Sequence, residues 1–151
     1  MISVDDPRAP DVRELLARHL AFAHETALEP GDVYALDVDG LADPAVTFFS
    51  YRVDGQVLGV AALKRIDDEH AEIKSMHTAE EARGQGIARA LLEHVVEVAR
   101  GRGYERLSLE TASTPPFVPA RTLYASAGFE PCESFADYRP SPNSTCMTLY
   151  L

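Results

Sequence analysis

Two glycines preceded by an arginine, in the run Arg83-Gly84-Gln85-Gly86, stand at the start of a segment with a helical pattern. Glycine in the first turn of a helix costs about 1 kcal/mol relative to alanine. The first N–H groups of a helix have no partner within it and carry roughly half a positive charge. Because glycine has no side chain, an anion can approach these groups closely. The run therefore predicts a phosphate or oxyanion site at residues 84–89, with Arg83 and Arg89 adding positive charge.

The glycine spacing differs from that of two common nucleotide-binding loops. No Gly-Lys-Ser/Thr sequence follows, as a loop for nucleoside triphosphates requires. The spacing also departs from the dinucleotide fingerprint, and no suitably placed acidic residue closes a second strand about 20 residues later. A tight turn between a strand and a helix remains the alternative interpretation of Gly84 and Gly86.

Hydrophobic periodicity predicts the elements that position this turn. Ile87, Leu91 and Val95 recur along one stripe of the segment after the glycines. Asp54-Gly55 suits a tight hairpin turn, in which both central residues have positive φ. We expect three helices: over residues 10–25, from the glycine turn to Gly101 or Gly103, and over residues 119–129. We expect two strands within residues 45–65 and further strands over 70–78, 104–111 and 144–151.

The order of these elements, β-α-β-β-β-α-β-α-β, predicts the fold class. A helix that connects two strands of one sheet implies a parallel pair, here 70–78 and 104–111. The hairpins before this pair imply antiparallel neighbours. We expect an α/β (α+β) fold with a mixed sheet of six to seven strands, helices on both faces, and a single domain spanning residues 1–151.

Composition narrows the classes of function. The formal net charge of −10 disfavours nucleic-acid binding, which depends on lysine and arginine. No apolar run is long enough for a membrane span, and the first ten residues do not resemble a secretory signal. We therefore expect a cytoplasmic protein in which Cys132 and Cys146 are reduced thiols. The five histidines are scattered, so we expect no metal site.

Two motifs together resemble the GNAT superfamily, the Gcn5-related N-acetyltransferases. Residues 83–88 match its Arg/Gln-x-x-Gly-x-Gly/Ala signature, and the run Leu123–Phe129 matches its LYxxxGF helix. The expected order of elements fits the family along nearly the whole chain. The segments EIKSM, RLSLET and PNS are similar to those of the YsnE-like branch of bacterial acetyltransferases. The resemblance implies the GNAT fold, with the two parallel strands in the middle of the sheet splayed apart.

The resemblance also implies acetyl-CoA as co-substrate, bound in the gap between these two strands. Like an added strand, the pantetheine arm should hydrogen-bond the backbone of residues 76–78. The start of the following helix should hold the pyrophosphate. The expected contacts are Met76, His77, Thr78, Arg83, Gly84, Gln85, Gly86, Ile87, Ala88 and Arg89.

The chemistry implied by the family is direct attack of an amine on the thioester. Tyr124 matches the family's general acid, which protonates the departing thiolate, although an aromatic on an apolar helix face can serve packing alone. Glu72 and Glu110 are alternative bases, His77 is a weaker third, and some relatives use ordered water. Strand alternation places Glu72, Lys74 and Met76 on one face, so Lys74 is an alternative partner that neutralises Glu72.

The acceptor is not encoded in a recognisable motif. We expect a primary amine of a small molecule, with a protein lysine or N-terminus as one alternative and a non-catalytic acyl-CoA sensor as the other. The pocket should involve the N-terminal helix, residues 25–45 and the last strands, and be reached by 131–143 with Phe135, Asp137 and Tyr138.

One position departs from the family pattern. Phe117 stands where relatives often have an asparagine that contacts the CoA arm, so that hydrogen bond is lost or supplied by Ser113 or Thr114, and Phe117 is a candidate for lining the acceptor pocket. The sequence does not decide whether the chain forms a homodimer.

Overall fold

The computed structural model describes residues 1–26, 38–136 and 138–151. Asp137 and most of the segment 25–45, both expected near the acceptor, therefore lie outside the described residues. The elements are β1 (Ile2–Val4), α1 (Pro10–Thr26), α2 (Val38–Leu41), β2 (Val46–Val53), β3 (Gln56–Arg65), β4 (His70–Thr78), the 3₁₀ turn η2 (Glu80–Ala82), α3 (Ile87–Gly101), β5 (Arg106–Ala112), the 3₁₀ turn η3 (Pro115–Phe117), α4 (Val118–Ser126), β6 (Glu130–Cys132) and β7 (Ser144–Tyr150).

The strands form a seven-stranded mixed sheet in the order β1-β2-β3-β4-β5-β7-β6. Only β4 and β5 are parallel among these described strands, and their connection runs through α3 as the crossover rule requires. The turn between β2 and β3 has the two positive φ angles expected, 52° at Asp54 and 82° at Gly55. The predicted fold class, a mixed sheet with a central parallel pair, is thus confirmed.

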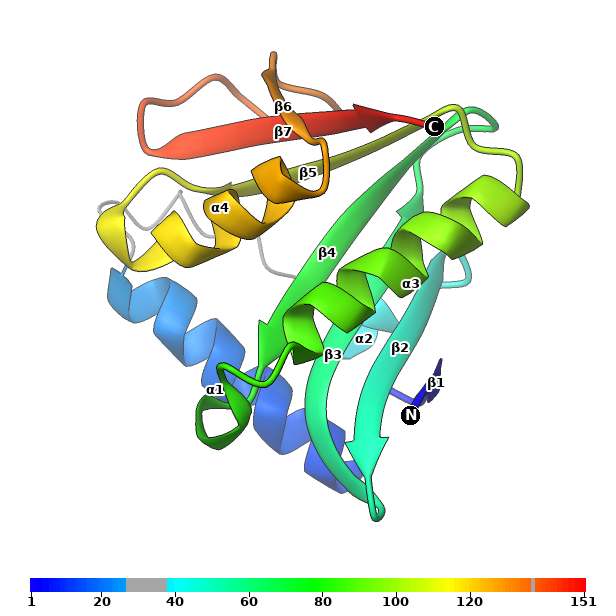
Figure 1. Ribbon diagram of the computed structural model, residues 1–151, viewed down its shortest axis with the longest axis vertical. Helices are drawn as coiled ribbons and strands as arrows, with labels where there is room; N and C mark the ends of the chain where they lie inside the picture. Colours follow the sequence, from blue (N-terminus) through cyan, green and yellow to red (C-terminus); the bar gives the residue numbers. More distant parts are fainter. Residues whose placement is uncertain (27–37, 137) are drawn as a thin grey trace.

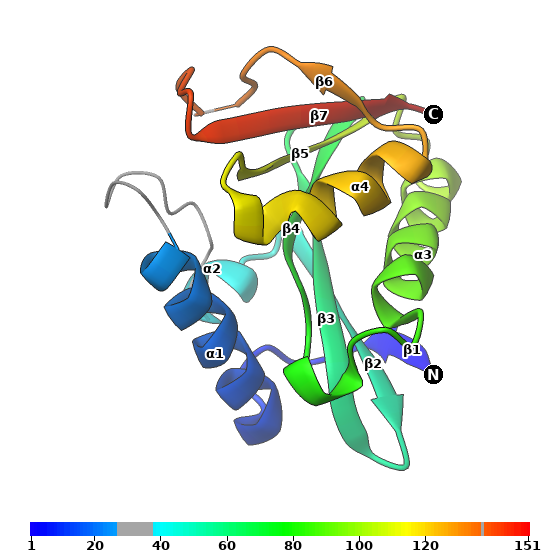
Figure 2. The same ribbon diagram turned by 60° about the vertical axis from the view of Figure 1, so that its left-hand side comes forward.

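Helices cover both faces of the sheet. Figure 2 shows α1 on one face and α3 on the other, with α4 beside β5 and β7. Gly59 on β3 lets α3 lie close to the sheet, because a Cβ there would be 2.8 Å from Ile87 Cγ2 and 3.0 Å from Leu91 Cδ1. No helix within the described part of the chain combines the length and apolar character needed to cross a bilayer.

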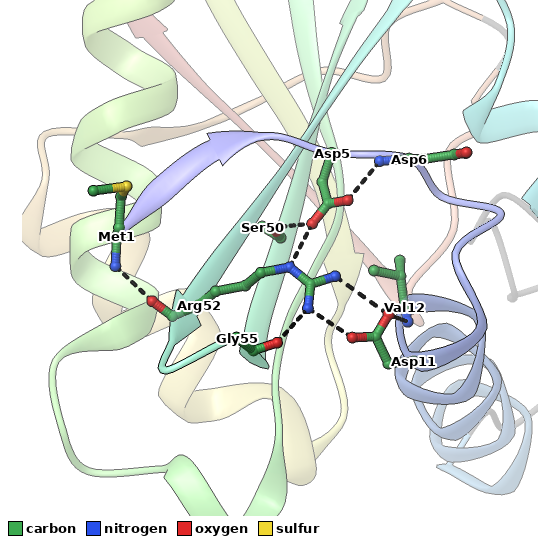
Figure 3. A network of polar contacts seen from close by, with 8 residues as sticks. All are labelled: Met1, Asp5, Asp6, Asp11, Val12, Ser50, Arg52 and Gly55. Carbon is green, nitrogen blue, oxygen red and sulfur yellow. Dashed lines mark hydrogen bonds and ion pairs between the residues drawn. The ribbon is translucent and has the colours of Figure 1, made fainter.

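Arg52 joins the N-terminal elements to the β2–β3 turn (Figure 3). Its Nε donates to Asp5 at 2.8 Å, and one Nη donates to Asp11 at 2.6 Å and to the carbonyl of Gly55 at 2.7 Å. Burial opposes ionisation of Asp5, but hydrogen bonds from Ser50 and Arg52 outweigh it and lower the pKa of Asp5. The Arg52 hydrogen bond also lowers the pKa of Asp11. The network fixes the start of α1 against the sheet, and α1 in turn borders the site described next.

Candidate active site

The site begins with a gap inside the sheet. β4 and β5 pair from His70↔Arg106 to Ile73↔Leu109, and the pairing stops there although both strands continue. Beyond this point the strands diverge, as Figure 1 shows. The splayed parallel strands that the family resemblance implies are therefore present, and residues 74–78 of β4 do not pair with β5.

A cavity of about 530 Å³ lies in and around this gap. Its volume falls in the ordinary range for small-molecule sites. It is lined from both faces of the sheet, by α1 on one side and the start of α3 on the other. The lining includes His19, Phe22, Lys74, Ser75, Met76, His77, Thr78, Arg83, Gly84, Gly86, Ile87, Ala88, Arg89, Glu110, Thr114, Phe117, Tyr124, Tyr138 and Asn143.

The glycine turn borders the cavity, but the glycines precede the helix rather than form its first turn. α3 begins at Ile87, and Gly86 is its N-cap with φ 79°, while Gly84 has φ 78°. Left-handed backbone costs an L-residue about 1–2 kcal/mol, which explains why glycine occurs at both positions. A Cβ at either position would meet no atom within 4 Å, so space for a ligand is open on this side.

The helix end supplies donors to that space. The first hydrogen bond of α3 runs from the N–H of Ala90 to the carbonyl of Gly86 at 3.0 Å. The N–H groups of Ile87, Ala88 and Arg89 therefore precede the helical ladder and can bind an anion. Arg83 and Arg89 line the same end of the cavity, whereas Gln85, expected among the contacts, does not line it.

β4 carries an irregularity beside the gap. Its register with β3 shifts between Val60↔His77 and Ala62↔Lys74, and Ser75 has φ 53°. This bulge interrupts the alternation predicted for the side chains of residues 72, 74 and 76. The alternation holds for Glu72 and Lys74 but does not extend to Met76. Residues 76–78 all line the cavity.

Tyr124 reaches the cavity from α4. It is buried, 7% exposed, and its ring packs 5.9 Å from that of Phe129. Burial raises the pKa of Tyr124, and the nearby carboxylate of Glu110 raises it further. The phenol therefore remains protonated at neutral pH and can donate its proton only to a strong base.

The two glutamates predicted as bases have different surroundings. Glu110 lines the cavity, and its Oε1 accepts a hydrogen bond from the Ser144 hydroxyl at 2.7 Å. Glu72 is 2% exposed and does not line the cavity. Its Oε2 accepts hydrogen bonds from the hydroxyl of Tyr138 and, at 3.4 Å, from the ammonium of Lys74. The structure therefore brings Glu110, and not Glu72, to the cavity surface next to Tyr124.

Tyr138 is a site residue to which the sequence gives no role beyond proximity to the acceptor. Its hydroxyl accepts a hydrogen bond from Lys74 at 2.7 Å and donates to Glu72. Burial, reinforced by Glu72, raises the pKa of Tyr138. The phenol, the ammonium and the carboxylate thus hydrogen-bond one another, which holds Tyr138 at the cavity.

Two histidines from opposite elements meet at the α1 side of the cavity. The rings of His19 and His77 lie 4.7 Å apart. Burial lowers the pKa of His19 to about 4 and that of His77 to about 3. Both imidazoles are neutral at physiological pH, and the low pKa makes His77 a weak base.

The remaining side chains named in the sequence analysis differ in whether they line the cavity. Ser113 Oγ pairs with Thr145 Oγ1 at 2.6 Å, whereas Thr114 and Phe117 line the cavity. Cys132 and Cys146 are opposite each other on β6 and β7 as free thiols. No three metal-ligating side chains are grouped within residues 1–26, 38–136 and 138–151.

The residues present fit acetyl-CoA. A turn with open space at two glycines, free helix donors and two arginines suits a pyrophosphate. The diverging edge of β4 offers backbone groups to an extended amide-containing arm. The thioester, when bound, supplies the activated acetyl group.

Comparison with known proteins supports the same assignment. Residues 10–129 match the model of the Acetyltransferase (GNAT) family. The chain is 44% identical over 149 residues to the uncharacterized N-acetyltransferase YsnE of Bacillus subtilis, covering 97% of each protein. It is 41% identical over 150 residues to the uncharacterized N-acetyltransferase YedL of Escherichia coli, covering 99% of this chain and 94% of YedL. Over 126 residues, 78% of this chain and 80% of the relative, it is 37% identical to the IAA acetyltransferase of Azospirillum brasilense.

Solved structures show the same fold. A crystal structure described as a putative acyl-CoA N-acyltransferase from Klebsiella pneumoniae superposes with a TM-score of 0.84 at 27% identity, covering 100% of this chain and 97% of that one. A GNAT family acetyltransferase from Elizabethkingia anophelis, solved with acetyl-CoA bound, superposes with a TM-score of 0.73 at 21% identity, covering 100% of this chain and 97% of that one. The splayed sheet, the glycine turn and these relationships together establish that the chain belongs to the GNAT family of N-acetyltransferases, which use acetyl-CoA.

Proposed function

We propose that this chain transfers the acetyl group of acetyl-CoA to the primary amine of a small molecule by direct attack, within one domain formed by residues 1–151. The observation that carries the proposal is the shared cavity. The anion-binding start of α3, the phenol of Tyr124 and the carboxylate of Glu110 all border it.

The two reactants approach from opposite faces of the sheet in this proposal. The glycine turn places the pyrophosphate at the start of α3, and the gap between β4 and β5 leads the pantetheine arm into the sheet. α1 borders the cavity on the other face, where His19 and Phe22 line it. The acceptor amine enters there and meets the thioester in the gap.

Two side chains handle the protons. Glu110 accepts a proton from the acceptor ammonium, which frees the nitrogen lone pair to attack the thioester carbonyl. The new N–C bond forms as the C–S bond breaks. Tyr124 gives its proton to the sulfur as the C–S bond breaks, so that the coenzyme leaves as a neutral thiol. The acetylated nitrogen loses a second proton to solvent as the amide forms, and the proton held on Glu110 passes through solvent to the tyrosinate, so that one proton is released overall.

A small acceptor is supported by cavity size and by precedent. A volume of about 530 Å³ accommodates a coenzyme arm and a compact second substrate. The relative from Azospirillum brasilense is an IAA acetyltransferase, which is a precedent for a small-molecule acceptor. The net charge of −10 favours the approach of a cationic amine.

Release of free thiol from acetyl-CoA across a panel of small amines and lysine-containing peptides tests the proposal. We expect turnover with small amines, and a fall of about 10²-fold or more in kcat in Tyr124→Phe with unchanged CoA affinity by calorimetry. Turnover with peptides alone would show a protein acceptor. CoA binding without thiol release from any amine would show a sensor, and either result would refute the proposal.

A further inference from the structure

Three buried polar atoms without a hydrogen-bond partner point to a second binding region in the cavity. Among the described residues these atoms are His19 Nδ1, Ser75 Oγ and Thr114 Oγ1. All three residues line the same cavity. Buried polar groups are almost always paired in folded proteins, so three orphan atoms on residues that line one cavity indicate that a ligand supplies the missing partners.

The hydroxyl of Thr114 makes no hydrogen bond to the backbone around it. Thr114 is the N-cap of η3, a position where threonine usually caps with its side chain, yet it makes no such hydrogen bond. Its carbonyl accepts hydrogen bonds from Arg121 at 3.1 Å and from the N–H of Phe117 at 3.1 Å. The residue is therefore held firmly with its hydroxyl unused.

Ser75 is held in a similar way on the other side of the gap. It occupies the bulge of β4 with φ 53°, and its side chain is buried at 8% exposure, as is that of Thr114. His19 reaches this region from α1, which packs against η3 through the rings of Phe22 and Phe117, 5.4 Å apart. The three orphan atoms are thus contributed by three separate elements around an apolar wall.

The charged groups nearby determine which ligand group fits. Lys74 is paired with Glu72, and both are less than 10% exposed. His19 and His77 are neutral because burial lowers the pKa of each. Arg83 and Arg89 border the pyrophosphate end, and Glu110 faces the reacting amine. The three residues that carry the orphan atoms offer hydroxyl and imidazole groups, and the charge of Arg83 acts on the neighbouring ring of His77.

We propose that His19, Ser75 and Thr114 form the acceptor subsite and bind a neutral hydrogen-bonding group, a hydroxyl or carboxamide, on an amine whose carbon chain lies against Phe22 and Phe117. This inference rests on the proposed function. It names a class of acceptor: amino alcohols and amino amides, in preference to simple alkylamines and amino acids.

Matched amines test the preference. Pentylamine, aminobutanol, aminobutanamide and aminobutanoate, each with the amine at the chain end, differ only in their distal group. We expect kcat/KM for the alcohol and the amide to exceed that for the other two by about tenfold or more. No thiol release from any of the four and from the wider panel would refute the proposed function, whereas equal rates with all four would refute this inference alone.

Variants locate the effect. Thr114→Val and Ser75→Ala should each remove most of the tenfold advantage of aminobutanol over pentylamine. Thr114→Ser should restore the advantage, which also controls for folding. Thr47→Val on β2, whose hydroxyl pairs with Arg102 at 2.8 Å away from the cavity lining, is the matched control. A raised KM for acetyl-CoA in Thr114→Val or Ser75→Ala would place these hydroxyls on the coenzyme and overturn the assignment.

Discussion

Glu72 and Glu110 are the same residue type in different surroundings, since Glu110 lines the cavity and Glu72 does not. Glu110 faces the cavity beside Tyr124, where a proton can be exchanged. Glu72 lies beneath the surface with Lys74 and Tyr138 as partners. We infer that Glu72 is a counter-ion for the lysine and that it positions the tyrosine, while Glu110 is the better candidate for the base.

Substituting each glutamate separates these roles. Glu72→Gln leaves the buried ammonium of Lys74 without its counter-ion, so we expect a loss of about 3 kcal/mol in the free energy of unfolding, measured with urea. Glu110→Gln should change that free energy by less than about 1 kcal/mol and abolish the rise of kcat/KM with pH. Glu97→Gln, on the exposed face of α3, is the control. Retention of the pH-dependent rise in Glu110→Gln would exclude it as the base.

At the residue level the sequence is informative only over short separations. The pairing of Lys74 with Glu72 follows from two-residue spacing on one strand, and it is present. The hydrogen bond from Tyr138 to Glu72 spans 66 residues and depends on the path of the last loop. No local pattern encodes such a contact, so Tyr138 could be placed only by the structure.

At the scale of elements, the start of α3 depends on backbone conformation rather than on side chains. Gly86 and Gly101 both have open space where a Cβ would be, but only Gly86 has a positive φ. Gly86→Ala should destabilise the protein by about 1–2 kcal/mol and weaken CoA binding, because the turn must change shape. Gly101→Ala, in ordinary helical backbone, should stabilise the protein by up to about 1 kcal/mol with CoA affinity unchanged. Thermal melts and calorimetry measure both effects, and equal behaviour of the two variants would refute this account.

Elements with strong periodicity could be predicted and short ones could not. The strand expected at 70–78 coincides with β4, and the helix expected at 10–25 with α1 to within one residue. β6 has three residues and α2 has four, which is too short for a repeating pattern. Pro131 also argues against a strand, and it is tolerated in β6 because that strand lies at the sheet edge.

At the scale of the whole molecule, the paired histidines make stability depend on pH. Both have a pKa near 6.5 when unfolded, and about 4 and about 3 in the folded protein. As pH falls below 6.5, the unfolded chain takes up protons that the folded chain does not, so stability falls until the folded pKa values are reached. Within this pH window, each histidine lowers the free energy of unfolding by up to about 1.4 kcal/mol for each pH unit of acidification.

Urea unfolding between about pH 7 and about pH 5 measures this dependence. We expect His19→Gln and His77→Gln each to flatten the slope, and the double variant to flatten it further. Asp5 and Asp11, whose pKa values are lowered, add a separate loss of stability that develops as pH falls through the region of 3.8 and below. A slope that is unchanged in the double variant would show that other groups cause the acid sensitivity.

The short parallel ladder between β4 and β5 has a mechanical consequence. Four residue pairs join the part of the sheet formed by β1 to β4 to the part formed by β5 to β7. These pairs lie at one end of β4, and the end of β4 at Thr78 lies about 16 Å further along, at about 3.3 Å per residue, so a rotation about the pairs would act over that length. A slight rotation about these pairs is thus magnified at that end, so repacking near Ile73 or Leu109 would alter the width of the entrance without touching any group that lines it at the far end.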